Sequence, residues 1–260
     1  MDLRESRARQ IIVRHPWELA RLEVVDQVIQ DHFDQRKALT VLDVGCGDTF
    51  FVEKLSERYT QCSFYAIDIE FEATDLELLR AKFGKTPIQV FATLEDMELK
   101  SAPASVDIVL LLDVIEHIED DVLFLQMLLS KPYINPQTKF FITVPAFQGL
   151  FMSHDVFLGH FRRYNNASLE ASIRQAGMRK NDIGYFFASL LPIRALQTLK
   201  ERLAGQKESA TGLVTWNGSE AAAAWMKRIL VWDYQLARLL KKVGIKLPGL
   251  SNYIVATKLK

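Results

Sequence analysis

The chain contains only two cysteines, Cys46 and Cys62, among its 260 residues. They form no Cys-x-x-Cys pair and have no Cys/His spacing of the kind that binds a metal ion. The first residues are charged and lack the apolar stretch of a secretory signal. No apolar run reaches the roughly 18 to 20 residues that a membrane-spanning helix needs. These absences favour a reduced, cytoplasmic protein.

The sequence also lacks a charge excess of either sign. Lysine and arginine together number 32, and so do aspartate and glutamate. A chain without net charge has no overall field to hold it on nucleic acid, so we expect no nucleic-acid partner. Hydrophobic residues make up 49% of the chain, which is enough for one large core or for a core with an appendage.

Short apolar runs alternate with amphipathic stretches over most of the chain. Continuous apolarity, rather than alternation, is typical of parallel strands that are covered on both faces. The predicted strands cover residues 38–45, 63–69, 88–92, 106–114, 138–144 and 253–259, and the predicted helices cover residues 19–33, 50–59, 75–83, 120–129 and 168–176. This succession predicts an α/β protein with a doubly wound sheet.

The pattern changes near Tyr185, where a nearly apolar run reaches Leu191 and Pro192 interrupts it. Two helical stretches follow, and a loop at 205–219 rich in small and polar residues separates them. We therefore expect an N-terminal helical segment at 1–37, a main domain at 38–187, a helical lid at 188–250 and the last strand at 251–260.

A glycine turn, Gly45-Cys46-Gly47, joins the first predicted strand to the helix that begins near Phe50. Such a turn lets a ligand approach bare backbone. A dinucleotide-binding fingerprint would place a third glycine at the position of Phe50. The sequence therefore argues against an NAD-dependent oxidoreductase, which we keep as a distant alternative.

The segment from Asp43 to Gly47 resembles motif I of the class I S-adenosylmethionine-dependent methyltransferases, including their type 11 and type 12 groups. In that motif an acidic residue precedes a Gly-x-Gly turn by two positions, as Asp43 precedes Gly45 here. The resemblance extends through five predicted strands as far as Pro145. It implies a Rossmann-like S-adenosylmethionine-binding domain at 38–187, a mostly parallel sheet with a final antiparallel strand, and a helical lid inserted before that strand.

Asp68 ends the second predicted strand, where a carboxylate can accept hydrogen bonds from both ribose hydroxyls of an adenosyl group. The resemblance further implies an adenine-contacting turn after the third strand and a cofactor-facing acid at the end of the fourth. The predicted cofactor-binding residues are Asp43, Gly45, Cys46, Gly47, Asp68, Ile69, Thr93, Leu94, Asp113 and His117. The expected cofactor is S-adenosylmethionine, with S-adenosylhomocysteine as product.

Residues 153–164 follow the fifth strand and are dense in groups that exchange protons or hold anions. This loop resembles a His-Asp, Gly-His and Arg-Arg-Tyr segment of some of these methyltransferases. We rank His154 first as general base, oriented by Asp155, and His160 second. Arg163 and Tyr164 are candidates for gripping an anionic group of the substrate. The alternative is that these side chains only hold the loop and the lid in place. We expect no metal ion at this loop.

The predicted helix at residues 225–243 carries an apolar stripe formed by Trp225, Ile229, Trp232, Leu236, Leu239 and Val243. Residues 188–250 hold ten basic and four acidic residues. This local excess suits an anionic membrane surface or an acyl-carrier protein. The alternative, which we weigh more heavily, is that the stripe packs on the sheet and that the basic residues lie on its solvated back.

We therefore expect an S-adenosylmethionine-dependent methyltransferase that transfers a methyl group in line to a hydroxyl oxygen, with a histidine as general base. The expected acceptor is a small molecule or a lipid-linked or carrier-linked group. The expected location is the cytoplasm, including the inner face of the membrane. A non-catalytic S-adenosylmethionine-binding scaffold is the main alternative.

Overall fold

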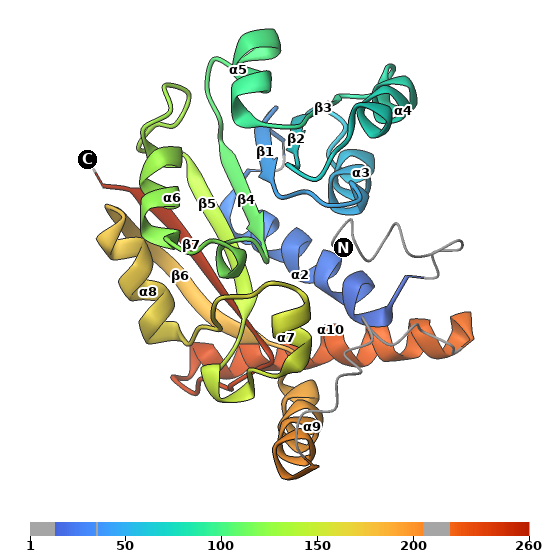
Figure 1. The fold of residues 1–260 in the computed structure, drawn as a ribbon, viewed down its shortest axis with the longest axis vertical. Helices are drawn as coiled ribbons and strands as arrows, with labels where there is room; N and C mark the ends of the chain where they lie inside the picture. Colours follow the sequence, from blue (N-terminus) through green and yellow to red (C-terminus); the bar gives the residue numbers. More distant parts are fainter. Residues whose placement is uncertain (1–13, 35, 205–218, 260) are drawn as a thin grey trace.

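A computed structural model describes residues 14–34, 36–204 and 219–259 of the chain. A seven-stranded sheet in the order β3-β2-β1-β4-β5-β7-β6 runs through it (Figure 1). Every neighbouring pair is parallel except those that β7 makes with β5 and β6. The strands are β1 (Thr40–Val44), β2 (Ser63–Ile67), β3 (Ile88–Phe91), β4 (Ile108–Leu112), β5 (Lys139–Pro145), β6 (Met178–Phe186) and β7 (Ser251–Lys258). The predicted sheet with a final antiparallel strand is confirmed.

Helices cover both faces of the sheet, and each face has its own core. One core lies under α2, α3, α4 and α10, and the other under α5, α6 and α8. The helices are α2 (Pro16–His32), α3 (Phe50–Arg58), α4 (Ala73–Phe83), α5 (Leu94–Ser101), α6 (Asp121–Leu129), α7 (Ser153–Phe157), α8 (Asn166–Gln175), α9 (Leu191–Ala204) and α10 (Glu220–Lys242), with short 3-10 turns η1 (Ile115–His117), η2 (Gln148–Leu150) and η3 (Ala188–Leu190).

The two cores explain why the strands read as continuous apolar runs. In β1, Val41 packs into one core and Leu42 into the other, and both side chains are buried. In β2, Phe64 likewise packs into the first core and Tyr65 into the second. Successive side chains of a strand point to opposite faces, so a strand covered on both faces must be apolar at every position.

Strand β6 was not predicted from the sequence. Its sequence, Met-Arg-Lys-Asn-Asp-Ile-Gly-Tyr-Phe, is half polar, and it lies at the edge of the sheet with β7 as its one neighbour. Three consecutive residues, 179–181, are exposed. The register shifts between Lys180 and Asp182, as in a β-bulge. An exposed, bulged edge strand has neither the apolar run nor the strict alternation that marks a strand in a sequence.

The second helix of the expected lid, α10, packs against α2 and contacts β6 (Figure 1). Its Leu230 and Tyr234 are buried in the core beneath α2. Lys227 reaches Glu23 at 2.7 Å, so an ion pair also joins α10 to α2. Helix α10 is therefore one of the helices that cover the sheet.

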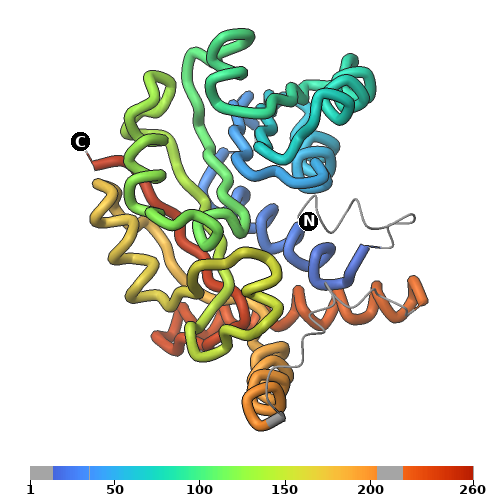
Figure 2. The backbone as a smooth tube through the Cα atoms, in the orientation of Figure 1, coloured from blue at the N-terminus to red at the C-terminus, as the bar shows by residue number. Residues whose placement is uncertain are grey.

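Helix α9 instead projects from the body of the molecule (Figure 2). A covering role for this part of the expected lid stays a prediction. Most of the expected loop at 205–219 lies outside the described residues, as do residues 1–13 of the N-terminal segment. Among the helices that the structure describes, none is long and apolar enough to cross a membrane.

Candidate active site

The predicted cofactor-binding residues meet where the carboxyl ends of β1, β2 and β4 lie side by side. The backbone N–H groups of Gly45 and Cys46 donate to the carbonyl of Ile67, at 2.8 and 3.0 Å. The N–H of Gly47 donates to Oδ2 of Asp68 at 2.7 Å. The glycine turn and Asp68 thus form one hydrogen-bonded unit, at the edge where open α/β sheets bind their ligands.

Both glycines of the turn have a left-handed backbone, with φ of 75° at Gly45 and 59° at Gly47. At Gly45 a side chain is also excluded by packing, because a Cβ atom would lie 2.6 Å from Cγ2 of Val114. Cys46 between them is buried, and burial raises the pKa of its thiol. The thiol is therefore protonated and serves as packing rather than as a nucleophile.

Asp43 carries a buried carboxylate on β1 that has no hydrogen-bond partner for either oxygen among the described residues. Burial, together with the negative charge of Asp68, raises the pKa of Asp43 to about 7. Buried polar groups without a partner are rare in folded proteins, because leaving them unpaired is unfavourable. Asp43 therefore fits a ligand that brings a hydrogen-bond donor or a positive charge to this edge of the sheet.

Two residues other than glycine adopt left-handed backbone conformations beside the same edge. Thr49, at the start of α3, has φ of 64° and is buried, and Asp113, after β4, has φ of 58°. Asp113 is held by Arg21 of α2 at 2.6 Å and accepts a hydrogen bond from Thr143 at 3.0 Å. Such conformations are unfavourable for residues with a Cβ atom and gather at functional sites.

The remaining predicted cofactor contacts lie at the ends of β2 and β3. Ile69 follows Asp68 and is 79% exposed, as expected for an apolar side chain beside a ligand site. The hydroxyl of Thr93 caps α5 by accepting from the N–H of Asp96 at 3.1 Å. Leu94 is buried in the core. The side chains of Thr93 and Leu94 thus already have structural roles, and their contact with adenine stays a prediction.

Asp155 organises the loop at residues 153–164 from a fully buried position. It accepts hydrogen bonds from Nε and Nη2 of Arg163, at 2.8 and 3.0 Å, and lies 2.9 Å from Nδ1 of His160. Burial raises the pKa of the Asp155 carboxyl, but the hydrogen bonds from His160 and Arg163 outweigh this and hold the pKa well below its ordinary value. Asp155 is therefore an anion at neutral pH and accepts hydrogen bonds only.

The interpretation that Asp155 orients His154 is wrong, because its carboxylate binds the ring of His160 instead. His154 and Asp155 are consecutive residues of the short helix α7. Consecutive side chains of a helix point in different directions. His154 is half-buried, and burial together with the charge of Arg194 lowers its pKa. His154 is thus neutral at pH 7.

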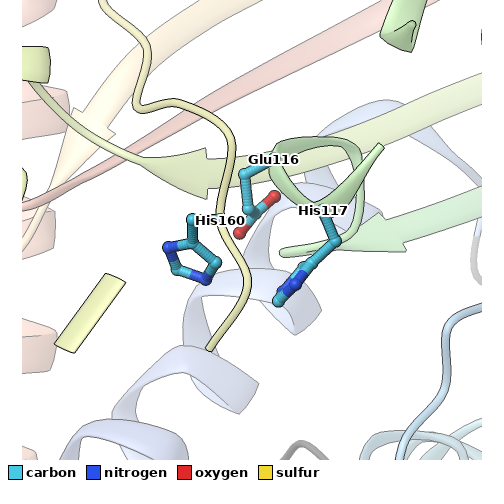
Figure 3. A group of neighbouring side chains, drawn as sticks. All are labelled: Glu116, His117 and His160. Atoms are coloured by element: carbon cyan, nitrogen blue, oxygen red, sulfur yellow. The ribbon is translucent and has the colours of Figure 1, made fainter. Parts of the chain in front are cut away.

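His160 also contacts a residue of the predicted cofactor site. Its ring centroid lies 4.6 Å from that of His117 in an edge-to-face arrangement, and Glu116 lies beside both rings (Figure 3). Glu116 was not predicted as a site residue, although it forms the Glu-His pair with His117 in the sequence. Its carboxyl group is fully buried, and burial together with the charge of Asp113 raises its pKa. This cluster joins the loop at 153–164 to the end of β4.

Glu116, His117 and His160 offer ligand atoms that lie within 4.8 Å of one another. Ligand atoms of a tetrahedral zinc site are about 3.4 Å apart, which falls inside this limit, so the expected absence of a metal stays a prediction. We expect activity to change less than twofold after dialysis against EDTA. The measurement is the initial rate before and after dialysis. Loss of activity that Zn²⁺ or Mg²⁺ restores would contradict the expected absence of a metal.

Arg163 and Tyr164 are both buried and bonded within the protein. Besides Asp155, Arg163 reaches the carbonyl of Ala146 at 3.3 Å. The hydroxyl of Tyr164 donates to Asp121 at 2.8 Å, and burial raises its pKa. Arg163 and Tyr164 both line a surface hollow of about 620 Å³, and none of the predicted cofactor residues lines it. These contacts favour the alternative that Arg163 and Tyr164 lock the loop; a grip on the substrate stays a prediction.

Comparison with solved structures gives the same fold. A putative sarcosine dimethylglycine methyltransferase from Galdieria sulphuraria has a TM-score of 0.57 at 15% identity, over 93% of this chain and 86% of that one. The [4+2]-cyclase SpnF has a TM-score of 0.56 at 18% identity, over 96% and 86%. Coclaurine N-methyltransferase bound to N-methylheliamine and S-adenosylhomocysteine has a TM-score of 0.53 at 14% identity, over 93% and 70%.

Comparison with family models gives a direct assignment. No curated protein matches the sequence. The model of a family described as "Methyltransferase domain" matches residues 17–182, which include the glycine turn, Asp68, the Glu116 cluster and the loop at 153–164. This match places the chain among methyltransferases rather than among NAD-dependent oxidoreductases. The chain belongs to the methyltransferase domain family, within the class I S-adenosylmethionine-dependent methyltransferases.

Proposed function

We propose that the enzyme methylates a hydroxyl oxygen, with His160 rather than His154 as the general base. The observation that carries this proposal is the position of His160 between Asp155 and His117. Because Asp155 only accepts hydrogen bonds, it fixes the proton of His160 on Nδ1. The lone pair then lies on Nε2, on the side of the ring opposite Asp155. The same logic orients the histidine in serine hydrolases.

S-adenosylmethionine bound at this edge would supply a methyl group activated by a sulfonium, with the acceptor oxygen taking the methyl carbon and S-adenosylhomocysteine as the leaving group. The hydroxyl proton passes to Nε2 of His160, and Asp155 stabilises the resulting imidazolium. Arg163 keeps Asp155 ionised for this task.

We propose the predicted cofactor residues as the binding site for S-adenosylmethionine. The unpartnered carboxylate of Asp43 supports the proposal, since the methionine ammonium is a cationic hydrogen-bond donor. Asp68 is placed at the edge where it can also meet ribose hydroxyls. The proposed contact set is Asp43, Gly45, Cys46, Gly47, Asp68, Ile69, Thr93, Leu94, Asp113 and His117.

The substitution Asp43→Asn is expected to weaken binding of S-adenosylhomocysteine and to stabilise the free protein. The folded-state pKa of about 7 lies above the ordinary value of 3.8, so ionisation of Asp43 opposes folding increasingly as pH rises from 4 to 7. At pH 8 the free energy of unfolding should therefore rise by roughly 1 to 4 kcal/mol in the variant.

Denaturant unfolding at pH 4 and pH 8 measures the stability effect, which should vanish at pH 4. Calorimetric titration at pH 8 measures binding, which should weaken about tenfold or more because a charge-assisted hydrogen bond is lost. Unchanged affinity in Asp43→Asn would contradict the role given to this carboxylate.

The proposed acceptor is a hydroxyl group on a small molecule or on a lipid-linked or carrier-linked group, reached in the cytoplasm or at the inner face of the membrane. The test is transfer of an isotope-labelled methyl group from S-adenosylmethionine to a panel of hydroxyl acceptors, each with and without a polyprenyl anchor. Matched amines form the control. Label on oxygen supports the proposal, whereas label found exclusively on nitrogen or carbon contradicts it.

The fold by itself leaves alternatives to methyl transfer, among them a non-catalytic scaffold. SpnF, with the same fold, is described as a cyclase, so the fold alone does not fix the reaction. A scaffold, however, has no need for an ionised, buried carboxylate that orients a histidine beside the predicted cofactor site. The geometry around Asp155 and His160 therefore favours catalysis.

A further inference from the structure

The apolar stripe of α10 faces outward, opposite to the interpretation that we weighed more heavily. Its members are between 36% and 71% exposed, and the tryptophans Trp225 and Trp232 are 67% and 70% exposed. The buried side of α10 is formed instead by Ala223, Leu230 and Tyr234, among others. We call the exposed side the outer face of α10, formed by Trp225, Ile229, Trp232, Leu236, Leu239 and Val243.

We propose that the outer face of α10 docks on the surface of an anionic phospholipid bilayer. Large contiguous apolar patches are rare on soluble monomers and mark interaction sites. At about 1.5 Å per residue, the face from Trp225 to Val243 is roughly 27 Å long. A long, narrow apolar face with tryptophan side chains is typical of helices that lie in the plane of a membrane interface.

Helix α9 carries a second exposed apolar surface next along the chain. Ile193, Leu196, Leu199 and Leu203 are each more than half exposed. Ile245, just beyond α10, is exposed as well. Both described helices of the segment 188–250 therefore carry several exposed apolar side chains.

Unpaired positive charges on α10 and just after it favour an anionic partner. Arg228, Lys242 and Lys246 are exposed and make no ion pair with any residue that the structure describes. Between residues 221 and 246 the sole acidic residue is Asp233, which is buried and accepts from Ser189 at 2.8 Å.

The basic residues on the other side of α10 differ, because they are already neutralised. Lys227, Arg238 and Lys241 pair with Glu23, Asp31 and Asp182. The cations of α10 itself that are left unpaired, among the described residues, are thus Arg228 and Lys242. A symmetric contact with a second copy would bring these like charges together, which is unfavourable. Anionic lipid headgroups attract them instead, at about 1 kcal/mol for each lysine or arginine near the surface.

Helix α9 also connects this region with the loop at 153–164. Glu201 of α9 accepts from the N–H of Ser153 at 2.8 Å, and Arg202 donates to the carbonyl of Gly149 at 2.8 Å. Arg194 reaches Asp155 at 3.5 Å. If the proposed function holds, a docked enzyme takes its hydroxyl acceptor from a lipid-anchored molecule, because α9, the helix before α10, contacts the loop that carries the general base.

The test is flotation of the full-length protein with phosphatidylcholine vesicles, with and without phosphatidylglycerol. We expect wild type to float with the anionic vesicles and to be released by high salt. The double variant Trp225→Ser/Trp232→Ser should lose roughly 90% of the floating fraction, since two interfacial anchors are removed. The variant Arg228→Glu/Lys242→Glu should also fail to float.

The matched control is Leu78→Ser/Leu99→Ser, which removes two apolar side chains of 71% and 87% exposure from α4 and α5 and should float as wild type does. Unchanged calorimetric binding of S-adenosylhomocysteine shows that each variant is folded.

Wild type that stays at the bottom with anionic vesicles would overturn the proposal. So would a dimer in light scattering that Trp225→Ser/Trp232→Ser dissociates, because the outer face would then bind a second copy. Flotation requires no methyl transfer, so its failure is distinct from a failure of the proposed function.

Discussion

Replacing His160 with glutamine is expected to lower kcat by roughly 10²- to 10⁴-fold, the usual contribution of a general base. The reason is that Asp155 holds Nδ1 of His160 at 2.9 Å and so fixes the tautomer that accepts a proton at Nε2. Glutamine keeps much of the side-chain volume but cannot accept the proton. Steady-state kinetics on a hydroxyl acceptor, with calorimetric titration of S-adenosylhomocysteine, measures both effects, and the product affinity should change less than twofold.

The matched control is His154→Gln, which removes the other histidine of the loop. Its neutral ring has no hydrogen bond to Asp155, so we expect kcat to fall less than about tenfold. The opposite ranking, with His154→Gln inactive and His160→Gln active, would contradict the account and restore His154 as the base.

The substitution Asp155→Ala is expected to lower the free energy of unfolding by roughly 3 to 5 kcal/mol, as for other broken buried ion pairs. Asp155 is fully buried, and its removal leaves the buried guanidinium of Arg163 without its carboxylate. Arg194 would lose the same partner. Urea denaturation followed by circular dichroism at pH 7 measures the change.

The pH dependence provides a second check on Asp155. Its folded-state pKa lies below the ordinary value, so its stabilisation is present above about pH 4 and is lost as pH falls further. The difference between wild type and Asp155→Ala should therefore shrink in acid. The control Glu170→Ala removes an exposed partner of Lys180 and should cost less than about 1 kcal/mol. Equal effects of the two substitutions would contradict the structural role of Asp155.

The sequence predicted most of the sheet because its central strands are buried on both faces. Val41 and Leu42 fill opposite cores, and this arrangement leaves a continuous apolar run that can be recognised. Strand β6 left no such run, because an edge strand exposes polar side chains and Lys180 to Asp182 form a bulge. Edge strands are thus the elements that hydrophobic periodicity identifies least well.

Periodicity also identified the apolar stripe of α10 but not its surroundings. A stripe with Trp225 and Trp232 shows that a helix has an apolar face, and it does not show what covers that face. The side of α10 that packs on α2 contains the buried Ala223 and Tyr234 and also ion pairs such as that of Lys227 with Glu23. Because charged residues alternate with apolar ones on this side, its sequence pattern is typical of a solvent-exposed surface.

Within the candidate site, the residues that directly follow the ends of strands were predicted best. The glycine turn and Asp68 follow strand ends, so their meeting at one edge follows from the topology of the sheet. The partner of Asp155 could not be predicted in this way, because His154 and His160 are both near it in sequence and side-chain direction decides between them. Glu116 was missed for a similar reason, since only the folded structure shows its burial beside His117 and His160.

Calorimetric titration of S-adenosylhomocysteine into wild type and Asp68→Ala tests the central claim most directly. The account predicts binding to wild type that is weakened by roughly 1.5 to 3 kcal/mol in the variant, since a carboxylate that accepts hydrogen bonds from the ribose is lost. The variant Asp34→Ala serves as control and should bind as wild type does, because Asp34 is exposed and precedes the amino end of β1, opposite to the edge that carries the site. Absence of binding to the wild-type protein would contradict the assignment of this site.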